Sequence, residues 1–565
     1  MTIRTFLDDA AKFMPDRPAQ IFFQKNEWVT RSFSALKERV IHAATIVKQL
    51  NIRPGEHNVA LMMDNGPEWQ EIYLALAGSG VAVVPLDPKL RSQEVFHILN
   101  DSEVVAIFAG AKLSQIFEPI IPHLPHLQSF VWVGDAADAT CTLKNKINIT
   151  YDAMLIKAAS MADSAREWFD THRPTADSIA SIIYTSGTTG KPKGAMLTHG
   201  NFTSNVVQTM KCVSGFSKDD NFLNVLPLFH SFSFTANFLV PLHLRSCCSF
   251  VRSLKTIADD MKIVKPTVLF AVPLMAEKLY GRVAEKLQKS LVARGLISVG
   301  LRSVICKKVK DSFGGRLRFI GIGGAPTPIP VLKGFQKLGF QVLEGYGLTE
   351  CAPGVAYPDH PWYVPGTVGH VIADMDYKII NVDAAGAGEL IVRGPNVMKG
   401  YYKNPDATAE AIDAEGYFHT GDLVRFDEKG NMSICGRRKA LIVNREGKNI
   451  YPEEVEQLIE GCSFIQDVIV LGYTVAGEVG ERVGAIIVPN AEVLESKRVA
   501  MKWSAQQANT FILNEVQQLC KQQLADYKIP RKLELRAEPL DRTSTMKVRR
   551  VVYAGTLDEL SPEKR

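Results

Sequence analysis

The chain of 565 residues lacks any apolar run long enough to cross a bilayer, which takes about 20 residues. Its first residues lack the apolar stretch of a secretory signal peptide. The nine cysteines are scattered and include no Cys-x-x-Cys pair, a usage typical of a reducing compartment. We read the adjacent Cys247 and Cys248 as small buried apolar side chains. We therefore expect a cytoplasmic protein without a transmembrane segment, whose membrane contact would at most be peripheral.

Internal repeats and low-complexity tracts are also absent, and the charge balance is only weakly basic. The formal net charge of +5 does not by itself imply a nucleic-acid partner. A hydrophobic fraction of 46% with 22% charged residues is ordinary for a globular protein. Because 565 residues exceed what one compact core holds, two or more domains are expected.

The order of the apolar segments predicts an α/β fold. Up to about residue 350, helical apolar spacing alternates with short apolar runs bounded by Gly or Pro. The expected helices are 33–50, 69–77 and 93–99, and the expected strands are 58–63, 81–86, 104–108, 179–183, 268–272 and 319–322. Such alternation favours helices layered on mostly parallel sheets, here as two α/β subdomains.

From about residue 366 the pattern changes to short β-like segments with frequent turns. Strands are expected at 377–382, 389–393, 422–426, 432–435, 468–472, 483–488 and 532–536, and helices at 452–459 and 505–524. This predicts a β-rich subdomain that completes a large domain of residues 1–436. A smaller α+β domain of residues 441–565 follows.

Residues 184–194, with the sequence YTSGTTGKPKG, are the most informative segment. An apolar strand leads into a loop of glycines, hydroxyl side chains and two lysines, and such a loop can bind a polyphosphate through backbone N–H groups and ammonium groups. It is not a Walker A loop, because Gly187 and Gly190 are only three residues apart and Pro192 follows Lys191.

This loop resembles the phosphate loop of the adenylate-forming (AMP-binding) superfamily, which includes the acyl-CoA synthetases. Further motifs of that family follow in its order: GIGGAP at 321–326, GYGLTE at 345–350, GYFHTGD at 416–422, GRRK at 436–439, EGKNIYPEE at 446–454 and RTSTMKVRR at 542–550. Together with the loop they extend from residue 184 to residue 550.

The resemblance implies a role for each matching residue. Nucleotide or coenzyme A contacts are implied for Thr185, Ser186, Gly187, Thr188, Thr189, Gly190, Lys191, Lys193, Gly323, Gly324, Ala325, Tyr346, Gly347, Asp422, Arg437, Lys439 and Gly447. Within this set Asp422 and Arg437 would contact the ribose, Lys439 would be the hinge residue of segment 437–440, and Gly447 would line the pantetheine channel. Thr185 and Glu350 would meet Mg²⁺, and the catalytic set would be Lys547, Glu350, Thr349 and His230.

These roles suit the chemistry of the side chains. Tyr346 offers a flat face to a base, and the Glu350 carboxylate offers a hard oxygen to Mg²⁺, which takes few protein ligands. The two oxygens of Asp422 match a vicinal diol. Lys547 would neutralise charge that builds up between the carboxylate and the α-phosphate.

Three positions depart from common forms of the family. Ala440 stands where an acid is frequent, Glu446 replaces the first glycine of a frequent Gly-Gly pair, and Met546 precedes the catalytic lysine in place of glycine.

The aromatic segment PLFHSFSF at 227–234 is expected to form an apolar wall on the acyl side, or else a packed strand end. His199 and His419 are expected to be structural.

The resemblance implies an ATP-dependent ligase that converts a carboxylic acid, of the medium- to long-chain fatty type, into acyl-AMP and then into an acyl-CoA. The substrates and cofactors would be the acid, ATP, Mg²⁺ and coenzyme A. Two alternatives remain at this point: an acyl-adenylating ligase that loads an acyl carrier protein, and a non-catalytic nucleotide-binding protein with the same fold.

Overall fold

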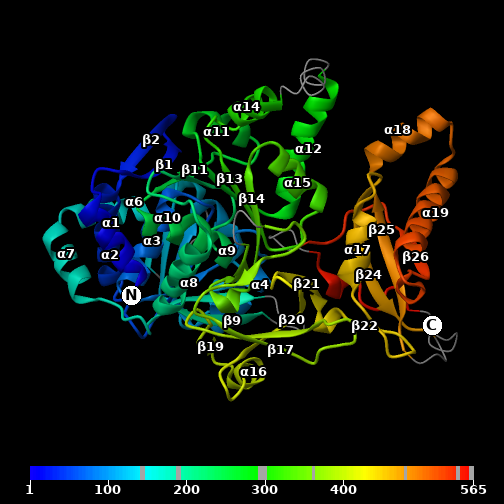
Figure 1. The fold of residues 1–565 in the computed structure, drawn as a ribbon. Coiled ribbons are helices and arrows are strands. Elements are labelled where there is room, and N and C mark those ends of the chain that lie inside the picture. The colour runs from blue at the N-terminus through cyan, green and yellow to red at the C-terminus, as the bar shows by residue number, and fades with distance from the viewer. Residues whose placement is uncertain are drawn as a thin grey trace. The chain divides into compact units, whose positions relative to one another are not determined.

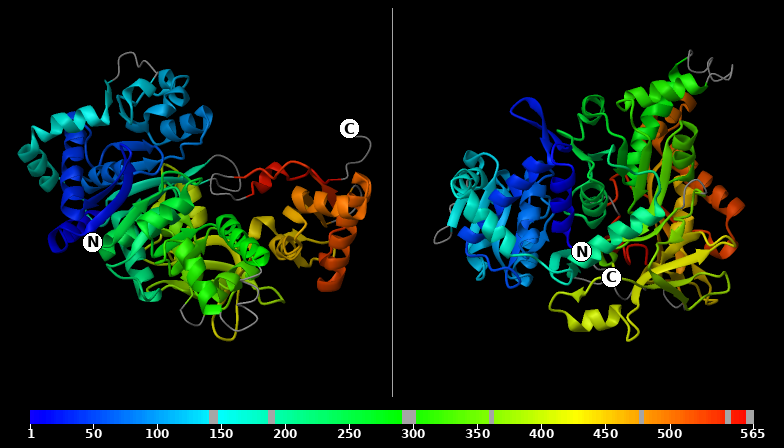
Figure 2. Two further views of the ribbon diagram at one scale, coloured as in Figure 1. Left: turned by 90° about the horizontal axis from the view of Figure 1, so that it is seen from above. Right: turned by 60° about the vertical axis from the view of Figure 1, so that its left-hand side comes forward.

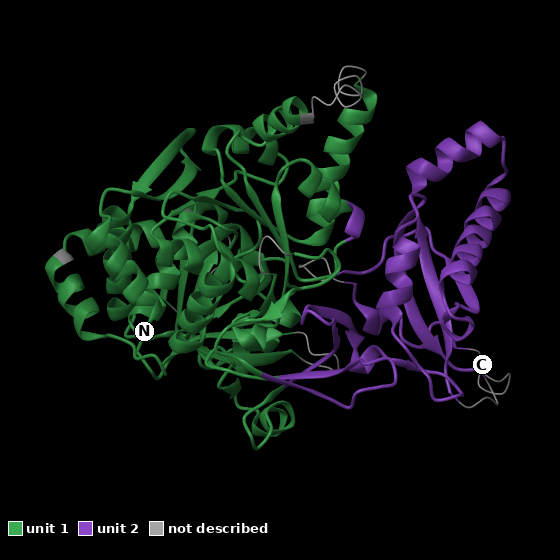
Figure 3. Cartoon of the chain, in the orientation of Figure 1, with its two compact units in different colours: residues 1–327, 331–376, 392–418 green, residues 328–330, 377–391, 419–565 purple. Residues whose placement is uncertain are grey.

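The computed structural model describes residues 1–139, 147–185, 192–290, 302–358, 363–475, 480–542 and 548–558. The chain divides into two compact units, shown in Figure 3. Unit 1 comprises residues 1–327, 331–376 and 392–418, and unit 2 comprises residues 328–330, 377–391 and 419–565. None of the helices in the described ranges is both long and apolar enough to cross a membrane.

The first sheet of unit 1 has the strand order β19-β9-β8-β4-β3-β5-β6-β7. Its strands are β3 (Asn58–Met62), β4 (Ala82–Pro85), β5 (Val104–Gly110), β6 (Ser129–Val133), β7 (Ile147–Thr150), β8 (Ile179–Thr185), β9 (Lys193–Thr198) and β19 (Gly400–Tyr401). The associated helices are α1 (Ile3–Phe13), α2 (Phe33–Gln49), α3 (Pro67–Gly78), α4 (Ser92–Asp101), α5 (Ser114–Phe117), α6 (Tyr151–Ala159) and α7 (Ala162–Thr171). The strands from β8 to β7 pair in parallel, whereas β9 is antiparallel to both of its neighbours. All residues of α3 except Glu68 are buried, because this helix is covered on almost every side.

The second sheet of unit 1 has the order β16-β15-β14-β13-β12-β10-β11-β1-β2. Its strands are β1 (Pro18–Gln24), β2 (Glu27–Ser32), β10 (Asn221–Asn224), β11 (Cys247–Phe250), β12 (Val268–Ala271), β13 (Phe319–Gly323), β14 (Gln341–Gly347), β15 (Gly354–Tyr357) and β16 (His370–Val371). Its helices are α8 (His199–Cys212), α9 (Ser231–Ser233), the π-helix η4 (Phe234–Leu239), α10 (Val240–Leu244), α11 (Ile257–Val264), α12 (Pro273–Lys289), α14 (Arg302–Ser312) and α15 (Ile329–Lys337). Between β11 and β14 all strand pairs are parallel.

The direction of the crossovers decides which helices share a face of this sheet. From β11 to β14 the chain steps one way along the sheet through α11, α12, α14 and α15, whereas β10 to β11 steps the other way through α10. Since parallel crossovers are right-handed, the two groups of helices lie on opposite faces, as Figures 1 and 2 show.

Unit 2 holds most of a four-stranded sheet and all of a three-stranded one. The first has the order β17-β18-β20-β21 and the second β24-β25-β26. The strands are β17 (Asp376–Ile380), β18 (Gly388–Arg393), β20 (Phe418–Phe426), β21 (Met432–Arg437), β22 (Ile442–Val443), β23 (Asn449–Ile450), β24 (Ile465–Tyr473), β25 (Arg482–Pro489) and β26 (Lys532–Leu535). The helices of unit 2 are α17 (Pro452–Glu460), α18 (Ala491–Met501) and α19 (Ala505–Gln523), while α16 (Pro405–Ala411) lies in unit 1. Val470, Val455 and Val516 bring β24, α17 and α19 into one apolar core.

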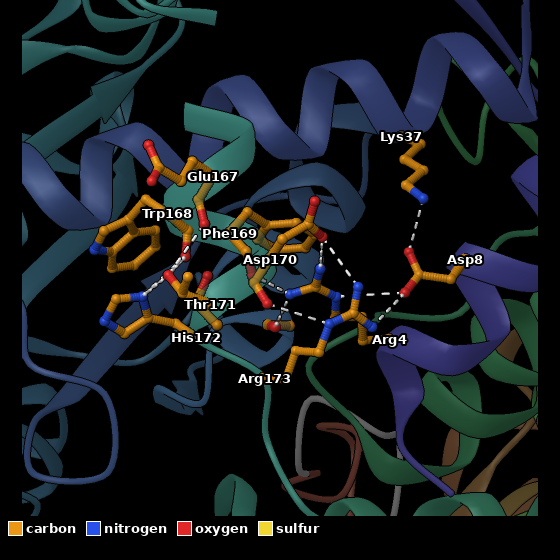
Figure 4. A network of polar contacts seen from close by, with 12 residues as sticks. Arg4, Asp8, Lys37, Glu167, Trp168, Phe169, Asp170, Thr171, His172 and Arg173 are labelled. Carbon is orange, nitrogen blue, oxygen red and sulfur yellow. Dashed lines mark hydrogen bonds and ion pairs between the residues drawn. The ribbon is translucent and has the colours of Figure 1, made fainter. Parts of the chain in front are cut away.

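A charged network around the buried Arg4 connects the first helix to the rest of unit 1 (Figure 4). Arg4 is only 2% exposed, its guanidinium lies 3.6 Å from the centre of the Phe169 ring, and it forms a 2.6 Å ion pair with Asp170. Asp8 pairs with Lys37 of α2 at 2.9 Å and with Arg173 at 3.2 Å. Burial lowers the pKa of Arg4, and the surrounding carboxylates oppose that effect. The network therefore connects α1, α2 and α7.

The predicted α/β fold is confirmed, with helices and strands at the expected places. No element was predicted at many other positions, among them α1, β1, α8, β9, β10 and α18. Residues 227–234 form a turn followed by a helix, so the strand-end interpretation of that segment is wrong. Cys247 and Cys248 are buried, as expected, and burial raises the pKa of Cys248 to about 12.

The domain boundary near residue 437 stays a prediction. The compact units divide the chain differently, because β17 and β18 pair with the strands that follow them.

Candidate active site at the ends of β8, β13 and β14

The predicted phosphate loop connects the two strands of a hairpin. Thr185 at the end of β8 pairs directly with Lys193 at the start of β9, so the two ends of the loop lie side by side. Ser186, Gly187, Thr188, Thr189, Gly190 and Lys191 lie outside the described residues. The hairpin was not predicted, because only the strand before the loop has a continuous apolar pattern.

The two predicted metal ligands lie together. Thr185 donates a hydrogen bond from its Oγ1 to Oε1 of Glu350 at 3.4 Å, a long contact. Glu350 belongs to the 3₁₀ turn η5 (Thr349–Cys351), which directly follows β14. Two hard oxygen atoms, one at the end of β8 and one in the turn after β14, therefore lie next to each other.

Tyr401 completes this group and was not predicted. Its hydroxyl donates to the same Glu350 oxygen at 3.0 Å, and the Nζ of Lys193 lies 5.3 Å from the centre of its ring. Burial, together with the Glu350 carboxylate, raises the pKa of Tyr401, so the hydroxyl keeps its proton and donates. No local signal marks Tyr401 in the sequence. It reaches the site only because β19 pairs with β9 about 200 residues away along the chain.

The two glycine-rich motifs lie on neighbouring parallel strands. Gly323 of β13 pairs with Gly345 of β14, so GIGGAP and GYGLTE meet at the carboxyl ends of their strands. Ligands of open α/β sheets bind outside such carboxyl ends. Tyr346 and Gly347 are the last residues of β14. The expected strand 319–322 already included Gly321, and in the structure β13 extends one residue further, to Gly323.

A buried carboxylate orders the loop that follows β13. Glu344 is 5% exposed and accepts a hydrogen bond from the backbone N–H of Thr327 at 2.6 Å. On its other side the Tyr363 hydroxyl donates to Oε2 at 3.5 Å. Burial raises the pKa of Glu344 to about 7. Glu344 thus connects β14 to the loop that carries Gly324 and Ala325, and it was also missed by the sequence analysis.

The aromatic segment before η4 packs against the Glu350 turn. His230 caps α9, with its ring accepting from the Phe232 N–H at 3.3 Å. The hydroxyls of Ser231 and Thr349 lie 3.1 Å apart. The structure therefore brings the His230 turn next to the GYGLTE motif, and a role of His230 toward a carboxylate stays a prediction.

The two predicted ribose residues are cross-strand partners. Asp422 of β20 pairs with Arg437 of β21, and the Arg437 Nε lies 2.9 Å from the Asp422 carboxylate. The Asp422 side chain is only 4% exposed, whereas that of Arg437 is 44% exposed. The ion pair with Arg437 fixes the Asp422 carboxylate in place, and each carboxylate oxygen can accept more than one hydrogen bond.

The predicted hinge residue Lys439 and the predicted pantetheine residue Gly447 lie in turns of unit 2. Lys439 is exposed in the 3₁₀ turn after β21. Gly447 lies between β22 and β23 with φ of +72°, and a Cβ placed there would meet nothing within 4 Å. Lys547 lies outside the described residues, but Arg542 and Val548 on either side of its segment form a β-bridge. Arg542 also pairs with Asp467 at 2.7 Å.

The two histidines predicted to be structural have structural contacts. The Nδ1 of His199 accepts from the Ile3 N–H at 3.2 Å, and burial lowers the pKa of His199 to about 4, so the ring stays neutral. His419 lies 3.7 Å from the buried carboxylate of Glu389.

An apolar cavity of about 50 Å³ lies against the inner end of the glycine motifs. Its walls come from α8, the turn before β10, η4 and strands β12 to β14. Among the residues that line it are Phe216, Phe232, Phe270, Phe319, Gly321 and Gly345. Because Gly345 belongs both to this wall and to the GYGLTE motif, the cavity adjoins the predicted nucleotide site.

The residues present suit a magnesium ion that is held mainly by its nucleotide. Thr185 and Glu350 provide oxygen ligands, which Mg²⁺ prefers. Within the described ranges, no group of three or more His, Cys, Asp or Glu side chains is placed to hold a metal by itself. Zinc or iron centres built from several such side chains are therefore not found in that part of the chain.

Comparison with known proteins identifies the family. Residues 7–402 match the AMP-binding enzyme family. The human long-chain-fatty-acid–CoA ligase 1 is 30% identical over 511 residues, which cover 83% of this chain and 71% of the relative. Long chain acyl-CoA synthetase 7, peroxisomal, of Arabidopsis thaliana is 28% identical over 475 residues, covering 79% of this chain and 67% of the relative.

Solved structures show the same fold. The crystal structure of ATP-bound MatB from Rhodopseudomonas palustris superposes with a TM-score of 0.74 and 26% identity, covering 98% of each chain. The fold and the ordered motifs define an adenylate-forming enzyme. The chain belongs to the AMP-binding enzyme family, and within it to the acyl-CoA synthetases.

Proposed function

We propose that this enzyme activates a medium- to long-chain fatty acid with ATP and transfers the acyl group to coenzyme A. In the first half-reaction the carboxylate attacks the α-phosphorus of ATP, which gives acyl-AMP and releases pyrophosphate. In the second half-reaction the coenzyme A thiol attacks the acyl carbonyl and AMP leaves. The names of the relatives support a fatty acid as substrate and coenzyme A as acceptor.

The apolar cavity is the observation that carries this proposal. Gly345 of the GYGLTE motif is one of its lining residues, and its walls are almost entirely apolar. The cavity of about 50 Å³ has room for the first carbons of an alkyl chain, whose carboxylate end would then lie at the carboxyl ends of β13 and β14, where the nucleotide is expected to bind. A cavity of this kind favours an alkyl acid over a polar one.

Phe270 and Gly321 both line the cavity. Both lie on paired strands, and a Cβ at Gly321 would come within 2.4 Å of the Phe270 ring. Phe270 also contacts Phe232 and Phe319, with ring centres 5.8 and 5.9 Å apart. The ring can lie flat on β13 only because residue 321 has no side chain. These aromatic contacts make Phe270 a wall against which an acyl chain would pack.

The residues of unit 1 are assigned to positioning of the triphosphate. Lys193 and the predicted phosphate loop would bind the β- and γ-phosphates, which leave as pyrophosphate. Thr185 and Glu350 would hold Mg²⁺, which supplies positive charge against the phosphates when it is bound. The Tyr401 hydroxyl orients the Glu350 carboxylate toward Thr185. Positioning and electrostatics then account for most of the catalysis.

The residues of unit 2 are assigned to the ribose and to the change between half-reactions. Asp422, held by Arg437, would accept hydrogen bonds from the ribose hydroxyls. Lys547 would bridge the carboxylate and the α-phosphate during adenylation. Rotation about Lys439 would then withdraw Lys547 and bring the Gly447 turn to the thioester site.

Two half-reaction assays test the proposal. Pyrophosphate release is measured with saturated acids from C2 to C18 and with aryl acids, each with coenzyme A. We expect the highest kcat/KM with an alkyl acid of medium or long chain. Lys547→Ala should abolish ATP–pyrophosphate exchange while largely retaining thioester formation from supplied acyl-AMP. An equal loss in both assays would contradict the role of Lys547.

The same assays separate the alternatives. If supplied acyl-AMP reacted with a holo-carrier protein and not with coenzyme A, the enzyme would be a carrier-loading ligase. If no acid supported ATP–pyrophosphate exchange, the protein would be a nucleotide-binding protein without this activity. The names of the relatives favour coenzyme A over a carrier protein as the acyl acceptor.

A further inference from the structure

The positive charge of the chain is concentrated in one segment. Residues 252–318 contain 15 lysines and arginines and five acids, a formal net charge of +10. Because the whole chain carries +5, the other 498 residues sum to −5. The segment includes α11, α12 and α14, which lie on the same face of the nine-stranded sheet (Figure 1).

Helices α11 and α14 pack beside each other through their apolar sides. Ile257, Met261 and Val264 of α11 are buried, as are Ile305 and Val309 of α14. At the end of α14 the backbone of Gly314 lies so close to α11 that a Cβ there would come within 2.2 Å of the Met261 carbonyl oxygen. The remaining sides of both helices therefore face solvent together.

The solvent side of this pair combines lysines with exposed aliphatic side chains. Lys265, Lys307 and Lys308 are exposed, and no acidic side chain of the described residues pairs with any of them. Leu254 and Ile263 are 61% and 52% exposed, and Val304 on α14 is 39% exposed. We call these residues, together with Lys255 and Lys262, the α11–α14 face.

The acids near this face do little to offset its charge. Asp260 is buried and pairs with Arg252 at 2.6 Å, and Asp259 pairs with Lys262 at 3.2 Å. Asp311 is exposed at the end of α14. The face therefore combines an excess of positive charge with exposed aliphatic side chains.

We propose that the α11–α14 face binds the surface of an anionic lipid bilayer. Lysines at such a surface are attracted to anionic headgroups, and aliphatic side chains between them can enter the interface. A nucleic acid would use the lysines but would gain little from Leu254, Ile263 and Val304. The choice of a membrane also rests on the proposed function, since a long-chain fatty acid partitions into bilayers.

Vesicle co-sedimentation of the full-length protein tests this proposal. The probes are vesicles of phosphatidylcholine with phosphatidylglycerol and vesicles of phosphatidylcholine alone, at low and at high salt. We expect binding only to the anionic vesicles, with a loss of affinity as salt rises. The triple variant Lys265→Gln, Lys307→Gln, Lys308→Gln should bind about a hundredfold more weakly. Ile263→Ser should weaken binding about tenfold.

Each control variant removes as many positive charges, or as many exposed aliphatic side chains, as the test variant that it matches. The triple variant Lys112→Gln, Lys157→Gln, Lys521→Gln removes three exposed lysines elsewhere, and Ile156→Ser changes a side chain that is 76% exposed. Both controls should bind like the wild type. Equal binding to neutral vesicles, or equal weakening by the control triple variant, would overturn the proposal.

Two further measurements separate the possible failures. ATP–pyrophosphate exchange with octanoate, a water-soluble acid, should be unchanged in all variants, which confirms that they fold. If the protein bound vesicles but neither the wild type nor any variant showed exchange activity, the proposed function would be rejected. The proposal of a membrane-binding surface would then still stand. Tighter binding to duplex DNA than to anionic vesicles, weakened by the same lysine variants, would instead make a nucleic acid the occupant.

Discussion

Replacing Glu344 by Gln should change how the stability of unit 1 depends on pH. Glu344 is 5% exposed, and burial raises its pKa from an ordinary 4.5 to about 7. The native state therefore holds a proton on this group at pH values where the unfolded chain has lost it. The stability contribution of the protonated carboxyl is fully present below pH 4.5 and is lost as pH rises through about 7.

The size of this effect follows from the shift in pKa. One unit corresponds to about 1.4 kcal/mol, so ionisation of Glu344 should lower the free energy of unfolding by roughly 2 to 3 kcal/mol between pH 5 and pH 9. A glutamine at this position can still accept from the Thr327 N–H but does not titrate. In Glu344→Gln the free energy of unfolding should not show this decline of roughly 2 to 3 kcal/mol between pH 5 and pH 9. The variant should therefore become more stable relative to the wild type as pH rises.

Urea unfolding at a series of pH values measures this difference. Trp69 and Trp132 are buried in unit 1, and their fluorescence reports its unfolding. Glu118→Gln removes an exposed carboxylate of the same unit and should leave the wild-type pH dependence unchanged. If Glu344→Gln and the wild type gave parallel curves from pH 5 to pH 9, the raised pKa of Glu344 would be wrong.

Three further predictions concern activity. Phe270→Ala should move the preferred acid to a longer chain, because it enlarges the cavity. It should also cost about 3 kcal/mol of stability, and an unchanged ranking of acids by kcat/KM would exclude Phe270 as a wall. Glu350→Gln should weaken Mg²⁺-dependent adenylation by roughly tenfold or more, and an unaltered Mg²⁺ titration would remove Glu350 from the metal site. Asp422→Asn should raise KM for ATP by roughly ten- to a hundredfold with little effect on Tm, because its Arg437 partner is 44% exposed. An unchanged KM would argue against a ribose contact.

The sequence predicted the fold well where apolar periodicity is continuous. The strands that became β3, β4, β5 and β12 were found within one or two residues, because buried parallel strands read as unbroken apolar runs. The hairpin partner β9 was missed, since its first residues belong to the glycine- and lysine-rich loop segment. Helix α18 was missed because it buries no residue and so has no apolar stripe to detect.

The candidate site was predictable where one motif carries the chemistry. Thr185 and Glu350 were paired from the family resemblance alone, and their side chains lie in contact. Tyr401 and Glu344 were not found, because each acts through a contact between distant segments. Tyr401 depends on the pairing of β19 with β9, and Glu344 depends on the loop after β13. Neither pairing leaves a local signal in the sequence.

The pairing of β19 with β9 also has a consequence for synthesis on the ribosome. Until Gly400 and Tyr401 are made, β9 is the open edge of the eight-stranded sheet and exposes unpaired N–H and C=O groups. About 200 residues separate the two strands, which corresponds to roughly 10 to 40 s of translation. Over that interval the strand that leads out of the phosphate loop is open to wrong partners. The nascent chain should therefore depend most on chaperones while residues 199–401 are emerging.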